Sequence, residues 1–177
     1  MSAAGTLLRK ELRETLRTWR LWVLPGILAF IGVSSPLMAA LLPAILRWSE
    51  GQSSGVSISV REPVARDAYL QFVGSLQELA ILAIIVTVAG LICGEVRSGS
   101  AALVLAKPLG RGAFVLVKFA AAALLLAAAL ALSVAVCVAF TAAVFGLGPV
   151  GAALWATLVW LPYALLFAAL TLLLSAA

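Results

Sequence analysis

The sequence predicts an all-α protein, a polytopic transmembrane helical bundle with an N-terminal interfacial amphipathic helix and a short cytoplasmic helix. Two observations carry this prediction. Of the 177 residues, 64% are hydrophobic and only 11% are charged, whereas a soluble domain is about half apolar and about a quarter charged. The apolar residues also gather in four long runs. A soluble fold of this size could not bury so much apolar surface, so lipid must cover it.

Residues 7–20, LLRKELRETLRTWR, form the first element. At about 100° per residue, Leu8, Leu12 and Leu16 share one helical stripe with a tryptophan, and the basic residues crowd another face. This pattern predicts a helix lying on the membrane surface, although a solvated extension of the next helix is the alternative. The residues expected at the membrane surface are Arg9, Lys10, Arg13, Arg17, Trp19 and Arg20.

Residues 21–46 carry no charge and predict the first membrane span, because about 20 residues cross the roughly 30 Å hydrocarbon core. A cleaved signal peptide is disfavoured, since its apolar core has only about 7–15 residues. The span contains three prolines, which remove backbone hydrogen bonds and are expected bend points: Pro25, Pro36 and Pro43.

Residues 47–75 predict an extracytoplasmic loop of mixed charge. The segment SEGQSSGVSISV is compatible with a short strand, and REPVARDAYLQF predicts a helix start. Its carboxylates, with Glu78 just beyond, accompany no metal-ligand pattern or glycine cradle, so a solvated loop is favoured over a catalytic site. The chain also has no histidine, which excludes histidine-based zinc sites and Ser-His-Asp triads.

The remaining runs predict three further spans, at residues 76–93, 113–145 and 152–177. A tight turn at residues 146–149 separates the last two. Cys93 and Cys137 lie in or beside apolar runs, which argues against a secreted disulfide framework. No metal or other cofactor is expected.

Lys and Arg concentrate in the N-terminal arm and around residues 94–112. Because cytoplasmic flanks carry the excess of basic residues, we expect the N-terminus and residues 94–112 to face the cytoplasm across the plasma membrane. The net charge of +5 is therefore local and does not indicate a nucleic-acid partner.

Residues 94–112 form the connector between the second and third spans and begin GEVRSGSAALVLAKPLGR. Ser98 or Ser100 can cap a short helix that extends to Leu105, and Pro108 and Gly110 then end it. A plain loop would not need this order of capping, apolar and helix-ending residues.

The segment GEVRSGSAALVLAKPLGRGAFVLVK resembles the cytoplasmic connector of ABC transporter type-2 permeases. The basic arm LLRKELRETLRTWR is similar to the elbow helix of that family, and DAYLQFVGSLQEL is similar to its outer segment before the second span. Ser100 stands where threonine is commoner. The residues that match the connector motif are Glu95, Gly99, Ser100, Lys107, Pro108, Arg111 and Lys118.

The resemblance implies a permease subunit of an ATP-binding cassette transporter, moving an unknown substrate. The chain has no GxxxxGK[ST] pattern, so a separate ATP-binding subunit would hydrolyse ATP and this chain would not be an enzyme. A second permease copy, as a homodimer, and membrane lipids are the other expected partners. The connector residues expected to bind the ATP-binding subunit are Glu95, Gly99, Ser100, Leu103, Leu105, Lys107, Pro108 and Arg111.

Two other functions stay open at this point. A non-transporting scaffold or sensor could use the same connector to hold a cytoplasmic partner. A channel or ion-coupled carrier is disfavoured, because such proteins bury ionisable groups near the midplane and the first, third and fourth spans have none there. The resembled family usually has six spans, so further spans are expected beyond residue 177.

Overall fold

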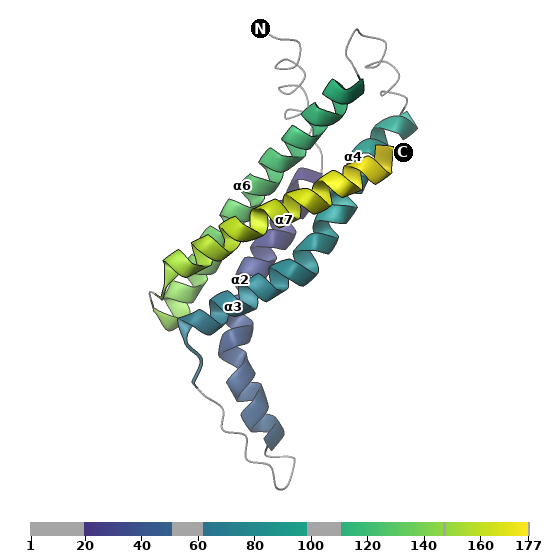
Figure 1. Ribbon diagram of the computed structural model, residues 1–177. Coiled ribbons are helices and arrows are strands. Elements are labelled where there is room, and N and C mark those ends of the chain that lie inside the picture. Colours follow the sequence, from purple (N-terminus) through teal and green to yellow (C-terminus); the bar gives the residue numbers. More distant parts are fainter. Residues whose placement is uncertain (1–19, 51–61, 99–110, 147, 177) are drawn as a thin grey trace.

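The computed structural model describes residues 20–50, 62–98, 111–146 and 148–176, and nearly all of them are helical (Figure 1). The elements are α2 (Arg20–Glu50), α3 (Ala65–Ser75), the π-helix η1 (Leu76–Ala80), α4 (Ile81–Ser98), α6 (Arg111–Phe145) and α7 (Val150–Ala176). The predicted helical membrane fold is confirmed for these residues. The amphipathic helix, the strand and most of the connector lie outside them.

Within the described residues, four helical stretches are long and apolar enough to cross a membrane: Trp22–Trp48, Ala65–Ala89, Leu116–Phe145 and Val150–Ser175. Alanine and leucine, the strongest helix formers, dominate α6. Its 35 residues make a helix about 52 Å long, which exceeds the hydrocarbon core and requires tilt or extension beyond it. The three prolines lie inside α2, which changes direction along its length (Figure 1).

The second membrane-crossing helix begins earlier than residue 76, where the sequence predicted it. Helix α3 starts at Ala65 and continues through η1 into α4 without a break. The Asp67 carboxylate accepts the backbone N–H of Val64 at 3.0 Å and satisfies a donor that the first turn leaves open. The predicted helix start in REPVARDAYLQF is thus confirmed, and the loop is shorter than residues 47–75, because α2 also extends to Glu50.

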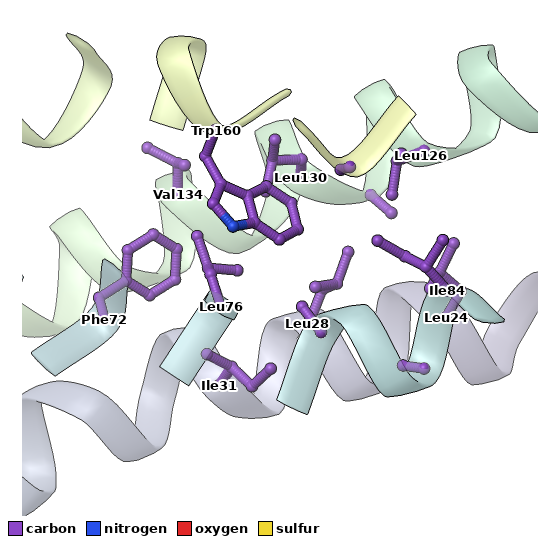
Figure 2. Packing of buried hydrophobic residues seen from close by; sticks show 14 of the residues in the cluster. Leu24, Leu28, Ile31, Phe72, Leu76, Ile84, Leu126, Leu130, Val134 and Trp160 are labelled. Atoms are coloured by element: carbon purple, nitrogen blue, oxygen red, sulfur yellow. The ribbon is translucent and has the colours of Figure 1, made fainter. Parts of the chain in front are cut away.

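The core is apolar and lies where α2, η1, α6 and α7 meet (Figure 2). It includes Leu28, Leu76, Leu130 and Trp160, each 4% exposed or less. Many large apolar side chains instead point outward, among them Val86 and Leu174. Such a surface is stable in lipid and would aggregate in water.

Helices α2 and α6 pack closely along one line of contact. A Cβ atom added to Gly32 would lie 2.6 Å from the Ser133 carbonyl oxygen and 3.3 Å from the Cys137 backbone nitrogen. The Ser133 hydroxyl donates a hydrogen bond to the Leu28 carbonyl. Small residues that let backbones approach, with a hydroxyl bonded across, are typical of membrane helix interfaces.

The two ends of the bundle differ. Helices α2 and α6 begin, and α4 and α7 end, toward the same end of the bundle, which is uppermost in Figure 1. At the opposite end the α6–α7 turn packs on the start of α3, because a Cβ on Gly148 would contact Ala65. Gly146 adopts a φ of 80° and ends α6, within the segment for which the sequence predicted a tight turn.

Candidate functional site

The helix ends that flank the connector form the first candidate site. Glu95 lies in the last turn of α4, and Arg111 is the first residue of α6. The predicted tip lies outside the described residues: Gly99, Ser100, Leu103, Leu105, Lys107 and Pro108. The structure therefore places the two helices that the connector joins, and the roles of its side chains stay predictions.

Of the predicted membrane-surface residues, the structure describes Arg20 alone. Arg20 is the first residue of α2, which begins toward the end where α4 stops and α6 starts (Figure 1). The other members of that set lie outside the described part of the chain: Arg9, Lys10, Arg13, Arg17 and Trp19.

The connector joins helices that have different main neighbours. Helix α6 packs most extensively on α2, whereas α4 packs most extensively on α7. The Ser175 hydroxyl of α7 donates to the Ala89 carbonyl of α4 at 3.3 Å. A force on the connector would therefore reach both helix pairs, α2–α6 and α4–α7.

Lys118 lies about two turns into α6 from the connector and is only 4% exposed. The sequence matched it to the connector motif, and the structure adds that the bundle encloses it. An ionisable side chain inside a membrane helix is costly and marks a functional position by default.

A second candidate site lies farther from the connector, at the π-helix η1. Gln77 and Glu78 are both exposed there, near the middle of the candidate span Ala65–Ala89. The sequence reasoning set Glu78 beside the loop carboxylates, because it did not extend the helix back to Ala65. The cap at Asp67 was the signal that could have placed Glu78 near the middle of the second span, Ala65–Ala89, and not at the start of the predicted span 76–93. Single π-turns inside α-helices frequently occur at functional sites.

An open pocket of about 610 Å³ lies beside this turn, between α3, η1 and α7. Its lining includes the Gln77 amide and the rings of Trp155 and Tyr163. Tyr163 packs edge-to-face on Phe167, with ring centroids 4.9 Å apart, which restrains its ring. The pocket thus combines aromatic surface with a polar group at membrane depth.

Among the described residues, two buried donors close to the core, the Tyr69 hydroxyl and the Trp160 indole N–H, have no hydrogen-bond partner. Trp160 lies among Val134, Leu130 and Leu76 (Figure 2), and it also lines the pocket. An unpartnered buried donor costs about 1–3 kcal/mol. The two unpartnered donors therefore lower the stability of the packing around them.

Another pocket, of about 600 Å³, lies between α6 and α7 and is lined almost entirely by apolar side chains. Its one polar lining residue, Thr157, donates to the Ala153 carbonyl of its own helix at 2.8 Å. This groove therefore offers van der Waals contact but no free donor for a polar ligand.

The described residues contain no group of three or more His, Cys, Asp or Glu side chains that could hold a metal ion. Cys137 is a buried free thiol whose sulfur lies 4.0 Å from the Thr141 hydroxyl oxygen.

Comparison with protein families adds an independent observation. Residues 6–177 match the model of the ABC-2 family transporter proteins. The chain belongs to the ABC-2 transporter family. The resemblance seen in the connector and the N-terminal arm is thereby confirmed, and the match also extends over the third and fourth spans.

Among curated proteins, the chain is similar to the uncharacterized transmembrane protein YxlG of Bacillus subtilis strain 168. The two are 24% identical over 119 residues, which cover 67% of this chain and 46% of that protein. The match thus spans about half of the relative's length. No solved structure matches this chain.

Membership of the ABC-2 family, together with the four apolar helices of the described residues, makes this chain a multi-pass membrane protein of a family of transporter proteins. Members of this family normally work with an ATP-binding subunit.

Proposed function

We propose that this chain is the permease subunit of an ATP-binding cassette transporter in the plasma membrane, powered by a separate ATP-binding subunit. The observation that supports this most is the position of the connector. It links α4 to α6 at the end of the bundle toward which α2 begins and α7 ends. An ATP-binding subunit docked there would contact the ends of several membrane-crossing helices at once.

A permease must convert movement of its ATP-binding partner into movement of helices. In this proposal a short coupling helix in residues 94–112 fits a cleft on the partner. Leu103 and Leu105 supply its apolar contacts, and Pro108 stiffens its junction with α6. Because α4 and α6 pack on different neighbours, displacement of the connector shifts one helix pair against the other.

The remaining parts of the proposal concern orientation and assembly. The N-terminal arm and the connector face the cytoplasm, as the basic residues in both segments favour. A second copy of the chain completes the pathway, with the substrate moving between the two. The arm at residues 7–20 rests on lipid headgroups and holds the start of α2 at the membrane surface.

The test is whether Leu103→Asp removes the ATP-binding subunit. The variant places a charge in the proposed apolar contact and should weaken association about 100-fold, the equivalent of roughly 3 kcal/mol. The measurement is co-purification of candidate ATP-binding subunits from membranes, together with the ATPase activity that depends on this chain.

Leu103→Ile is the matched control, because it keeps the apolar side chain and should retain the partner. Wild-type recruitment by Leu103→Asp would contradict the proposed contact. Recruitment of a different cytoplasmic protein, with no ATPase that depends on this chain, would instead favour the scaffold function.

A further inference from the structure

The π-helix η1 (Leu76–Ala80) interrupts regular α-helical winding in the middle of the second membrane-crossing helix. The backbone on both sides is ordinary α-helix, because Ser75 has a φ of −64° and a ψ of −32°, and Ile81 has a φ of −61° and a ψ of −46°. The extra residue that a π-turn holds is therefore confined to this one turn. Helices change direction at such turns, and the chain bends between α3 and α4 (Figure 1).

The helices on the two sides of η1 belong to different packing groups. Helix α3 packs mainly on α2, and α2 packs most extensively on α6, where the Ser133 hydroxyl donates to the Leu28 carbonyl. Helix α4 instead packs mainly on α7, where the Ser175 hydroxyl donates to the Ala89 carbonyl. At η1 the chain therefore passes from a group formed by α2, α3 and α6 to a pair formed by α4 and α7.

The two faces of η1 differ in how firmly they are held. Leu76 and Ala80 are fully buried in the core, whereas Gln77 and Glu78 are exposed. Gly74, one turn before, has open space where a Cβ atom would be. A change of bend at η1 therefore keeps the buried side chains in place while the exposed face lengthens or shortens.

The pocket between α3, η1 and α7 supplies the space for such a change. It has a volume of about 610 Å³, with Val73 and Gln77 on one wall and Trp155 and Val159 of α7 on the other. Helix α7 thus stays with α4, to which it is hydrogen bonded, and is separated from part of α3 by the pocket. A different bend at η1 would change the width of this pocket.

We propose that η1 is a hinge, at which α4 and α7 swing as a pair against α2, α3 and α6 and so widen or narrow the pocket between α3 and α7. Hinges are a few residues that absorb the change in backbone angles between two rigid groups. This inference rests on the proposed function, because displacement of the connector supplies the force. Helix α4 has 18 residues and ends at Ser98, beside the connector, and it carries that displacement over about 27 Å to η1.

The test measures two distances by pulsed electron paramagnetic resonance, on the full chain in lipid nanodiscs and in a cysteine-free background. Spin labels at Val73 and Val159 report the width of the pocket, because both residues line it. Labels at Val86 and Leu174, which are exposed on α4 and α7, form the matched pair within one moving group. The hinge predicts a broad or two-component distribution for the first pair and a single narrow distance for the second.

Deletion of Gln77 is the decisive variant. A π-turn holds one residue more than an α-turn between the same flanks, so the deletion converts η1 into α-helix while α3 and α4 keep their buried faces. The first pair should then lose its second distance and become as narrow as the matched pair. Gln77→Ala is the control, because it removes the same side chain but keeps the chain length, and it should leave both distributions unchanged.

Gly74→Ala keeps the proposal testable if the deletion prevents folding. No atom lies within 4 Å of the added Cβ, and alanine stiffens the turn before η1, so the first distribution should narrow without loss of the fold. Size-exclusion chromatography shows whether each variant remains folded. A single narrow distance for the first pair in the wild type, or no narrowing in any folded variant, would overturn the hinge. Equal broadening of the second pair would also overturn it, because α4 and α7 would not move together.

These distances are measured without an ATP-binding subunit, so their failure is distinguishable from failure of the proposed function. If the first pair shows one distance and Leu103→Asp removes the ATP-binding subunit, the permease assignment stands and the hinge is wrong. If the pocket has two widths and no ATP-binding subunit associates, the hinge is real and the proposed source of its force is wrong.

Discussion

At the scale of single residues, the contact between α2 and α6 depends on the absence of a side chain at Gly32. Both atoms nearest to an added Cβ belong to the backbone, at 2.6 Å from the Ser133 carbonyl oxygen and 3.3 Å from the Cys137 nitrogen. Backbone atoms cannot rotate away as a side chain can, so the two helices would have to separate.

We expect Gly32→Ala to lower the stability of the folded bundle by about 1–3 kcal/mol, despite the better helix propensity of alanine. The measurement is the apparent melting temperature in detergent. Gly26→Ala is the matched control in the same helix, because nothing lies within 4 Å of its added Cβ, and it should not lower the melting temperature. Equal melting temperatures for the two variants would show that α2 and α6 can separate at no cost.

At the scale of elements, the sequences of the N-terminal arm and the first span predict different contacts with the membrane, binding at its surface for the arm and crossing of its core for the span. The arm alternates apolar and basic residues at helical spacing, whereas residues 21–46 contain no charge. An amphipathic helix binds the membrane surface through apolar burial plus attraction to anionic lipids. Its electrostatic share, about 1 kcal/mol for each basic residue near the surface, is sensitive to salt.

A synthetic peptide of residues 7–20 should therefore be unordered in water and helical on anionic vesicles. Circular dichroism during titration with vesicles measures both states. Raising the salt concentration should weaken binding, because it shortens the Debye length. Binding of equal strength to neutral and anionic vesicles would show that the basic face has no role.

At the scale of the whole molecule, the arrangement of the helix ends links the orientation of one end of the bundle to that of the other. One measurement of orientation therefore decides the topology of the described helices. The helix ends that flank the connector and the start of α2 lie toward one end of the bundle, and the α6–α7 turn lies at the other (Figure 1). If the connector is cytoplasmic, the turn and residues 51–61 are outside. The basic residues favour this orientation over its inverse.

Single cysteines at Ser54 and Ser98, in a Cys93→Ala and Cys137→Ala background, test this orientation. An impermeant thiol reagent applied to intact cells should label position 54 only, and should label position 98 only after the membrane is opened. The background without introduced cysteines is the control. Labelling at position 98 in intact cells would reverse the topology.

The sequence by itself determined the fold class and the four helices of the described residues that are long and apolar enough to cross a membrane. The bilayer provides no water to satisfy backbone groups, so each long apolar run must become a helix, and residues 21–46 or 113–145 can be read without knowledge of their neighbours. The family resemblance was equally readable, because its motif is continuous in the connector.

Only the tertiary structure decided which helices pair and what each polar residue faces. Gly32 acquires its importance from Ser133, about a hundred positions later, and such a contact leaves no local pattern. Lys118 is enclosed because other helices surround it. Glu78 lies mid-helix because the Asp67 cap starts α3 at Ala65, and the pocket beside Gln77 exists because α7 supplies its other wall. Local composition predicts burial in lipid, whereas side-chain surroundings depend on helices brought together from distant parts of the chain.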